Sequence, residues 1–479
     1  METAFIDLHI HPALKPLGRS YDRKAGINNP SPKAINSLWH YDPPTFADKV
    51  VNIATGLTKF RQSDFTSLAR GGAEVVFVSL CGLEKGFVTN RLGTRLPGDV
   101  TANLVTGIGK KRIDHIQAMP DYFTDMELEY NFYRQLDDHK VNIDGKWHRY
   151  KIISSFGEIE ENQLPDVYTI WVILTMEGAH GFNGGLQQMG RKADEAEVLA
   201  NVEKVKQWDH RLFFMGMAHH FYNDLVGHAQ SLSGIVRKFC DQSEGMNEGF
   251  TELGRKVLQK LLDTTNGRRV LIDLKHMSIK AREEYYQYLK EAHNDEIVPL
   301  IASHGAVNGL RSAREKVEDD KFNYGKFQPT DINFFDDEIV RIARSEGLFG
   351  IQFDERRVAS ETELKKSGPR LNRRKMLFYQ SRLVWNQIQH IAEVLNRHEL
   401  FAWGIQCIGS DYDGMVNPLN GFWTAEEMPL LDSYLEKHAY NFIHSPASES
   451  FKDYNRLSAS EIVERFMRGN AHHFLMKNF

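Results

Sequence analysis

The sequence predicts an α/β fold in which eight parallel strands, alternating with helices, close into a (β/α)8, TIM-like barrel. Eight short apolar runs bounded by polar residues recur along the chain, and segments of helical periodicity separate most of them. Apolar runs of this length are typical of strands that are buried on both faces. Regular alternation of strand and helix favours parallel βαβ units, and eight such units are the number that closes a barrel.

The expected elements follow from these two patterns. The strands cover residues 4–8, 74–80, 168–176, 212–218, 270–274, 298–303, 348–353 and 402–409. Helical periodicity covers residues 65–69, 193–207, 250–263, 281–293, 336–345 and 382–397. Ser63-Asp64 and Gly71-Gly72 are start and stop signals for the first of these helices.

Two segments interrupt the repeat. Residues 141–154 contain Asn142-Ile143-Asp144-Gly145 between β-type flanks, which predicts a hairpin inserted before the third barrel strand. Residues 317–331 and 355–374 are charged and loop-like, which predicts excursions over the barrel mouth. We therefore expect one elaborated domain over residues 1–479, with insertions at about 120–160 and 315–375.

The composition is that of an ordinary globular protein: 41% of the 479 residues are hydrophobic, 26% are charged, and the net charge is −5. This charge gives no electrostatic attraction to nucleic acid or to an anionic membrane. No apolar stretch approaches the ~18 residues of a spanning helix, and neither a secretory signal nor a lipid-anchor tail is expected. Three isolated cysteines predict no disulfide framework. We expect a reduced, cytoplasmic protein that acts on a small molecule, and leave a homodimer open.

Six of the apolar runs lead into residues that can bind a metal or move a proton. These residues are His9 with His11, Glu177, His219, His276, His304 and Asp411. The carboxyl ends of barrel strands meet at one mouth, where (β/α)8 enzymes keep their active sites. The pattern therefore predicts a metallohydrolase.

Each of these residues also has a structural interpretation. His9 and His11 share one face of a strand and can reach one ion, but they could also be two solvent-facing histidines at a loop start. Glu177 is either a paired structural acid or a ligand, because an unpaired buried charge is too costly to keep. A single histidine such as His276 or His304 is more often a hydrogen-bonded core residue. Two of them on successive strands, downstream of the histidine pair and the glutamate, favour ligands.

Asp411, in Gly409-Ser410-Asp411-Tyr412-Asp413-Gly414, ends the eighth strand, where it could contact a metal and shuttle a proton. Asp413 is the alternative, and we interpret it as a turn residue beside Gly414. Histidine ligands with a shared carboxylate suit zinc, and a paired site suits hydrolysis. No correctly placed Walker loop, dinucleotide fingerprint or nucleophile elbow supports a nucleotide-binding or serine-hydrolase function.

Short motifs carry a resemblance to a known family. D-L-H-I-H, M-E-G-A-H, M-A-H-H-F-Y-N-D, I-D-L-K-H-M-S, A-S-H-G-A and G-S-D-Y-D-G occur in this order, with S-D-F-T-S-L-A-R-G-G before the second strand and R-G-N-A-H-H-F-L near the end. The chain thereby resembles the membrane (renal) dipeptidase family of the amidohydrolase superfamily. The resemblance spans nearly the whole length, with longer insertions between the motifs.

The resemblance implies one or two zinc ions at the barrel mouth. One ion would be held by His9, residue 11 and Glu177, and the other by Glu177, His276 and His304. His219 would polarise the scissile carbonyl or hold the oxyanion, with its neighbour His220 as a less favoured alternative. Asp411 would move the proton from water to the leaving amine. Arg314, with Arg311 as a rival, would hold the substrate carboxylate.

The chain departs from the family at His11, where the first motif normally has aspartate. This change removes one negative charge from the first metal shell and leaves metal number and peptide specificity open. The sequence thus predicts a metal-activated hydrolase of an amide bond in a small substrate, with a dipeptide as the best single expectation. A non-peptide amide, a phosphoesterase of the polymerase-and-histidinol-phosphatase type, and a metal-binding barrel without turnover are the alternatives.

Overall fold

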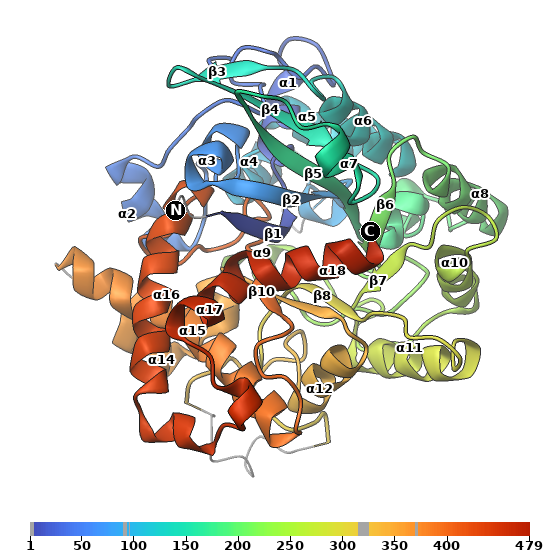
Figure 1. The fold of residues 1–479 in the computed structure, drawn as a ribbon. Coiled ribbons are helices and arrows are strands. Elements are labelled where there is room, and N and C mark those ends of the chain that lie inside the picture. Colours follow the sequence, from blue (N-terminus) through green and yellow to red (C-terminus); the bar gives the residue numbers. More distant parts are fainter. Residues whose placement is uncertain (1–3, 90–92, 95, 315–324, 369–371) are drawn as a thin grey trace.

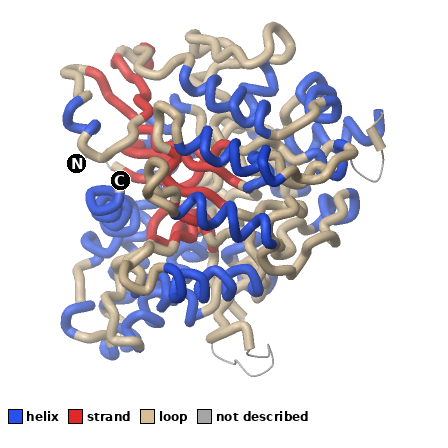
Figure 2. Tube along the Cα trace, turned by 90° about the vertical axis from the view of Figure 1, so that its right-hand side faces the viewer, coloured by secondary structure: helices blue, strands red, loops and turns tan. Residues whose placement is uncertain are grey.

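The computed structural model describes residues 4–89, 93–94, 96–314, 325–368 and 372–479 (Figure 1). Its centre is a closed barrel of eight parallel strands, as predicted, and helices and loops surround the barrel (Figure 2). The barrel strands are β1 (Phe5–Ile10), β2 (Ala73–Leu80), β5 (Val167–Glu177), β6 (Leu212–Gly216), β7 (Leu271–Asp273), β8 (Ile301–Gly305), β9 (Leu348–Ile351) and β10 (Gln406–Ile408). All eight expected strands are confirmed.

Closure comes from two pairings that join distant parts of the chain. β2 pairs with β5 across the inserted hairpin, and β10 pairs with β1 through Asp7 and Ile408. Every residue of β1, β6, β7, β8, β9 and β10 is buried, which explains the continuous apolar runs.

The inserted hairpin is confirmed. It consists of β3 (Val141–Ile143) and β4 (Lys146–Ile152), which pair in antiparallel fashion. Asp144 and Gly145 form its tight turn, and both have positive φ values, of 51° and 84°. Aspartate and glycine tolerate this left-handed conformation, which matches the twist of a two-residue hairpin. β4 then pairs in parallel with the first half of β5, while β6 pairs with its second half.

The helices of the structure match five of the six expected ones to within two residues at each end, and the helix expected from residue 382 begins nine residues earlier. They are α1 (Leu14–Ser20), α2 (Phe46–Thr55), α3 (Phe65–Gly71), α4 (Leu96–Thr106), α5 (Lys110–Ala118), α6 (Phe123–Arg134), α7 (Glu158–Glu161), α8 (Glu195–Lys206), α9 (Gly234–Phe239), α10 (Glu252–Leu262), α11 (Ile279–Ala292), α12 (Asp336–Arg344), α13 (Glu355–Val358), α14 (Glu361–Ser367), α15 (Arg373–Arg397), α16 (Met428–Ile443), α17 (Ala459–Glu464) and α18 (Asn470–Asn478). In the described part of the chain none of them is long and apolar enough to cross a membrane.

The expectation that residues 355–374 are loop-like is wrong for α13 and α14. Asp354 and Ser360 begin these helices, because their side chains accept hydrogen bonds from the backbone N–H groups of Arg356 and Glu363. Of the other charged segment, residues 317–324 lie outside the described residues.

The carboxyl-terminal segment covers the amino-terminal end of the barrel (Figure 1). Asn470, at the start of α18, donates hydrogen bonds to the carbonyls of Trp403 and Gln406, just before and at the start of β10. The guanidinium of Arg468 pairs with Glu74 near the start of β2. This end of the barrel is therefore used for packing, and the opposite end is left for the site.

Candidate metal centre

The predicted metal ligands all lie at the carboxyl end of the barrel. His9 and His304 belong to β1 and β8, and Glu177 is the last residue of β5. His11 follows directly after β1, and His276 and Asp411 each lie three residues after the ends of β7 and β10. Parallel strands deliver these side chains from opposite walls to one point, and each is at most 6% exposed.

Glu177 lies between two pairs of histidines. Its Oε2 lies 3.5 Å from His9 Nε2 and 3.1 Å from His11 Nε2. Its Oε1 lies 3.1 Å from His276 Nε2 and 3.3 Å from His304 Nε2. Each carboxylate oxygen therefore faces one pair of imidazoles, which is the arrangement of a carboxylate that bridges two cations.

The spacing of these atoms fits tetrahedral ions. The Nε2 atoms are 3.0 Å apart within the His9–His11 pair and 3.3 Å apart within the His276–His304 pair. Two nitrogens bound at 2.0–2.1 Å to one tetrahedral zinc ion would be roughly 3.3 Å apart. Four imidazoles and one carboxylate with these separations form two candidate three-ligand sets that share Glu177. The residues present therefore fit two divalent ions, and the imidazole of His11 belongs to the first candidate set.

Two of these side chains depend on strained backbone. His276 and Asp411 have φ values of 66° and 60°, in the left-handed region that non-glycine residues rarely adopt. Gly178, which follows Glu177, has φ of 89°, and a Cβ there would lie 2.4 Å from the ring of His180 and 2.9 Å from the Cβ of His219. Backbone strain of about 1–3 kcal/mol per residue is typical of functional sites, where the surrounding structure imposes it.

The charges of the cluster shift the pKa values of its members in opposite directions. Burial raises the pKa of Glu177, but the positive charges and hydrogen bonds of the surrounding histidines outweigh burial and hold this pKa well below its usual range. Burial lowers the pKa of His11, but the hydrogen bond and charge of Glu177 and the charge of Asp411 raise it to about 9. Burial lowers the pKa of His9 to about 4. Without metal, the proton of this pair therefore resides on His11.

Asp411 faces the ligands and the cavity together. Its Oδ1 lies 3.6 Å from His11 Nε2, and its Oδ2 accepts a hydrogen bond of 2.6 Å from the amide of Gln352. Burial and the nearby charge of Glu177 raise its pKa to about 7, which is the range in which a carboxyl group can both accept and return a proton.

Asp413 belongs to a separate pair. Its Oδ1 lies 2.7 Å from the ammonium of Lys15, and its Oδ2 accepts hydrogen bonds from Ser63 and from the backbone of Gln62. Lys15 is buried and donates its other hydrogen bond to the carbonyl of Phe60. Asp413 therefore anchors the loop below Asp411, in agreement with its interpretation as a turn residue.

His219 points into the metal centre. Its Nε2 lies 3.4 Å from Glu177 Oε2, and its Nδ1 lies 2.7 Å from Glu84 Oε2. The ring of His220 instead forms a hydrogen bond of 2.6 Å with the hydroxyl of Ser231. Of the two neighbouring histidines, His219 therefore contacts the Glu177 carboxylate, and His220 bonds Ser231.

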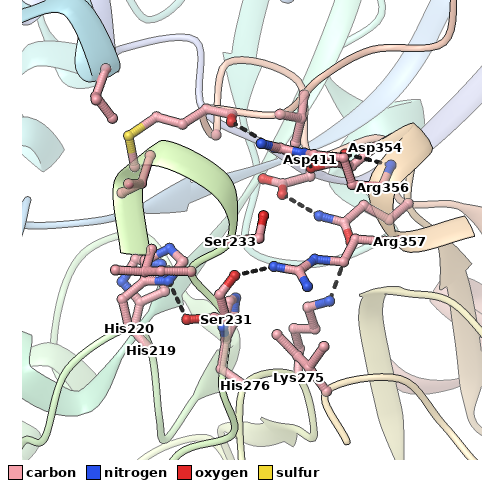
Figure 3. Close-up of a pocket in the computed structure, with 18 of the residues that line it drawn as sticks. His219, His220, Ser231, Ser233, Lys275, His276, Asp354, Arg356, Arg357 and Asp411 are labelled. Atoms are coloured by element: carbon pink, nitrogen blue, oxygen red, sulfur yellow. Dashed lines mark hydrogen bonds and ion pairs between the residues drawn. The ribbon is translucent and has the colours of Figure 1, made fainter. Parts of the chain in front are cut away.

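A cavity opens beside this centre, and three cationic side chains line it, those of Lys275, Arg356 and Arg357 (Figure 3). The guanidinium of Arg357 extends between Asp411 and Lys275 and donates a hydrogen bond to the carbonyl of Ser231. Lys275 donates to the amide oxygen of Gln352, and burial together with the charge of Arg357 lowers its pKa to about 7. Neighbouring Arg356 is neutralised by Asp354, with a contact of 2.5 Å. In the described part of the chain, neither Arg357 nor Lys275 has a carboxylate within ion-pair distance.

Arg314 does not reach this cavity. Its side chain is exposed, as is that of the rival Arg311, and neither is among the described residues that line the cavity. Arg357, from α13, lines the cavity instead.

The sequence patterns missed four polar residues of the site, namely Glu84, Lys275, Gln352 and Arg357. Lys275 precedes His276, and Gln352 ends the apolar run of β9, so the strand-end pattern that identified the ligands applies to both. Glu84 and Arg357 lie further along their loops, where no periodic signal marks them.

No family model and no curated protein matches the sequence. Solved structures with a similar fold include a metallopeptidase from Rhodobacter sphaeroides bound to a phosphinate mimic of the dipeptide L-Ala-D-Ala, at 14% identity and a TM-score of 0.49, covering 97% of this chain and 99% of that one. Another is dipeptidase AC, a metallopeptidase, at 14% identity and a TM-score of 0.48, covering 98% of this chain and 99% of that one. A third is the probable dipeptidase PvdM from Pseudomonas aeruginosa, at 14% identity and a TM-score of 0.47, covering 88% of this chain and 90% of that one. At this identity the likeness concerns the fold, and function is inferred from the residues of the site.

Proposed function

We propose that this protein is a metal-dependent hydrolase that cleaves the amide bond of a small substrate, with a dipeptide as the expected substrate. The observation that carries the proposal is the division of the Glu177 carboxylate between two histidine pairs, with Asp411 and His219 on either side. A site built only for structure has no need of a proton carrier and a second polar group facing the same open cavity.

The metal set would consist of His9, His11 and Glu177 for one ion and Glu177, His276 and His304 for the other, with Asp411 near the first. Divalent ions held there lower the pKa of water towards neutrality and polarise a carbonyl group. Zinc is the expected metal, because imidazoles with one shared carboxylate at tetrahedral spacing suit it.

The chain's own residues supply the proton and charge chemistry. Asp411, with a pKa of about 7, accepts a proton from the attacking water and returns it to the leaving amine. His219 lies where it can donate a hydrogen bond to the oxygen that becomes negative when the carbonyl is attacked. Glu84 holds the other nitrogen of this ring and so sets its orientation.

Arg357, supported by Lys275, is the residue we propose for binding the free carboxylate of the substrate. Two neighbouring cations that line a cavity without a carboxylate partner are stabilised when an anion binds between them. A guanidinium is suited to a carboxylate because its donors form a planar fork. This assignment replaces Arg314 by a residue that lies in the cavity.

A substrate panel tests the proposal. The protein, stripped with a chelator and reloaded with zinc, is assayed on dipeptides, their carboxyl-terminal amides, a non-peptide amide and a phosphate monoester. We expect metal-dependent cleavage of dipeptides. Turnover of the phosphate ester alone would support a phosphoesterase, and metal binding without any turnover would support a binding protein.

A further inference from the structure

The hydroxyl of Ser303 contacts three polar side chains at the base of the metal centre. Its Oγ lies 3.1 Å from Nδ1 of His9 and 2.8 Å from Nδ1 of His304, and it donates a hydrogen bond to Asp273. Ser303 is fully buried and Asp273 is 2% exposed. Because bulk solvent is excluded here, these polar groups have to find their hydrogen-bond partners among themselves.

The protons available to these groups determine which partner donates in each hydrogen bond of Ser303. Asp273 also accepts from the backbone N–H groups of Ser303 and Lys275, so its carboxylate acts as an acceptor throughout. The single proton of the Ser303 hydroxyl is then directed to Asp273, and the oxygen can only accept from the two rings. Both His9 and His304 therefore carry their proton on Nδ1. Their Nε2 atoms face Glu177 as bare lone pairs, which is the form that binds a metal.

The other two histidines are held differently. Nδ1 of His11 lies 3.1 Å from the backbone carbonyl of Ser79, a partner that no side-chain substitution removes. Nδ1 of His276 has no hydrogen-bond partner in the described part of the chain. One side-chain hydroxyl thus holds one histidine from each of the two ligand pairs.

We propose that Ser303, held by Asp273, is a positioning residue shared by both metal subsites, which sets the tautomer of one ligand of each ion. The inference rests on the proposed binding of two ions by this site. It predicts that removal of this single hydroxyl lowers the affinity of both metal subsites, although the two ligand pairs come from different strands.

The test is a metal titration of chelator-stripped protein without substrate, using Zn²⁺ for affinity and Co²⁺ for its visible absorption spectrum. For Ser303→Ala we expect both binding steps to weaken by about 10- to 100-fold, the usual effect of losing a partner of a metal ligand, and the Co²⁺ spectrum to change. Ser381→Ala is the matched control. Ser381 is equally buried, its hydroxyl also bonds a histidine ring, that of His438, and it belongs to the outer helix α15. Both steps should keep wild-type affinity in this control.

Melting of the metal-free proteins shows whether each variant folds. If Ser303→Ala does not fold, Asp273→Asn, which removes the charge that holds the hydroxyl proton, should weaken both steps. Wild-type affinity in either step of a folded variant overturns the inference, as does a wild-type protein that binds only one ion. Coupled loss of both ions in a protein that hydrolyses none of the substrate panel would leave the inference standing and remove the proposed function.

Discussion

The carboxylate of Glu84 lies against the side of His219 that faces away from the metal centre, with Oε2 2.7 Å from Nδ1. Its other oxygen accepts hydrogen bonds from the backbone N–H groups of His220 and Phe221. Because this carboxylate is held at three points, the ring of His219 has one orientation, and its Nε2 faces the cavity. A buried glutamate from the loop after β2 therefore positions a residue from the loop after β6.

His219→Ala should reduce turnover with little effect on metal content or melting temperature. The ring contacts Glu177 but lies outside both ligand pairs, and loss of one oxyanion donor typically costs 10²–10³ in kcat. Steady-state kinetics, metal analysis and melting check this. A variant that unfolds, or that loses metal while keeping its rate per ion, would show that His219 has another role.

Glu177→Gln should lower the metal content from two ions to at most one. A carboxamide offers one oxygen, so one histidine pair would face an NH2 group instead of a ligand. Elemental analysis measures the stoichiometry. Glu84→Gln is the matched control, because it neutralises a neighbouring buried carboxylate outside both ligand pairs and should leave two ions bound. Two ions in Glu177→Gln would exclude Glu177 as a bridge.

Substitution of Asp411 should mainly lower turnover, and substitution of Asp413 should mainly lower stability. Asp411→Asn should retain the fold, because burial and the charge of Glu177 disfavour the charged form of Asp411, and should lose about 10²–10⁴ in kcat. Asp413→Ala leaves the buried ammonium of Lys15 without its partner and should cost about 3–5 kcal/mol of stability. Denaturant unfolding and kinetics on both variants separate the two effects. Equal destabilisation by both substitutions would contradict these roles.

The contribution of His11 to the stability of the metal-free protein should fall as the pH rises from about 6.5 towards 9. Lys275, whose pKa is lowered to about 7, contributes in the opposite direction over part of this range, so the His11 effect is read from a comparison of variants. The pKa of His11 in the folded chain, about 9, lies above the unfolded value of about 6.5, so folding favours its protonated form. That stabilisation is complete below pH 6.5 and is lost as the pH passes through the folded pKa. Denaturant unfolding from pH 6 to 9.5, in chelator, measures it. The wild type should lose stability relative to His11→Gln as the pH rises through this range, and a constant difference between the two curves would assign the dependence elsewhere.

The barrel could be predicted because each strand depends on a local signal. A strand such as β8 is buried on both faces, so it appears in the sequence as a run of consecutive apolar residues. His304 lies near the carboxyl end of this run and is therefore expected at the barrel mouth. The turn at Asp144-Gly145 is equally local, since both residues accept positive φ. The candidate metal ligands, Asp411 and His219 could therefore be predicted from the sequence.

The missed residues depend on contacts between distant parts of the chain. The pairing of β4 with the first half of β5 has no local signature, because it is set by how the hairpin folds back. Arg357 reaches the cavity because it belongs to α13, which lies beside the cavity. In the sequence, the segment that contains Arg357 has the composition of a charged loop, so nothing predicted this position. A signal did exist for the neighbouring helix α14, since Ser360 and Glu363 have the spacing of a helix start.

The last prediction distinguishes the two arginines proposed for the substrate carboxylate. Arg357→Ala should lower kcat/KM for a dipeptide by about 10²-fold, because roughly 3 kcal/mol of transition-state stabilisation is lost when a guanidinium–carboxylate pair in a closed site is removed. The carboxyl-terminal amide has no carboxylate to bind, so its already low kcat/KM should change little. The preference of the wild-type protein for the free acid should therefore nearly disappear.

Arg314→Ala serves as the control, since its exposed side chain does not line the cavity, and both substrates should be cleaved at wild-type rates. Equal losses on acid and amide in Arg357→Ala would indicate that Arg357 supports the loop around Ser231 and leaves the carboxylate to another group. A selective loss on the acid in Arg314→Ala would restore the assignment that the sequence motif implies. It would also mean that the loop after β8 moves towards the mouth when substrate binds, because only such a movement brings Arg314 to the cavity.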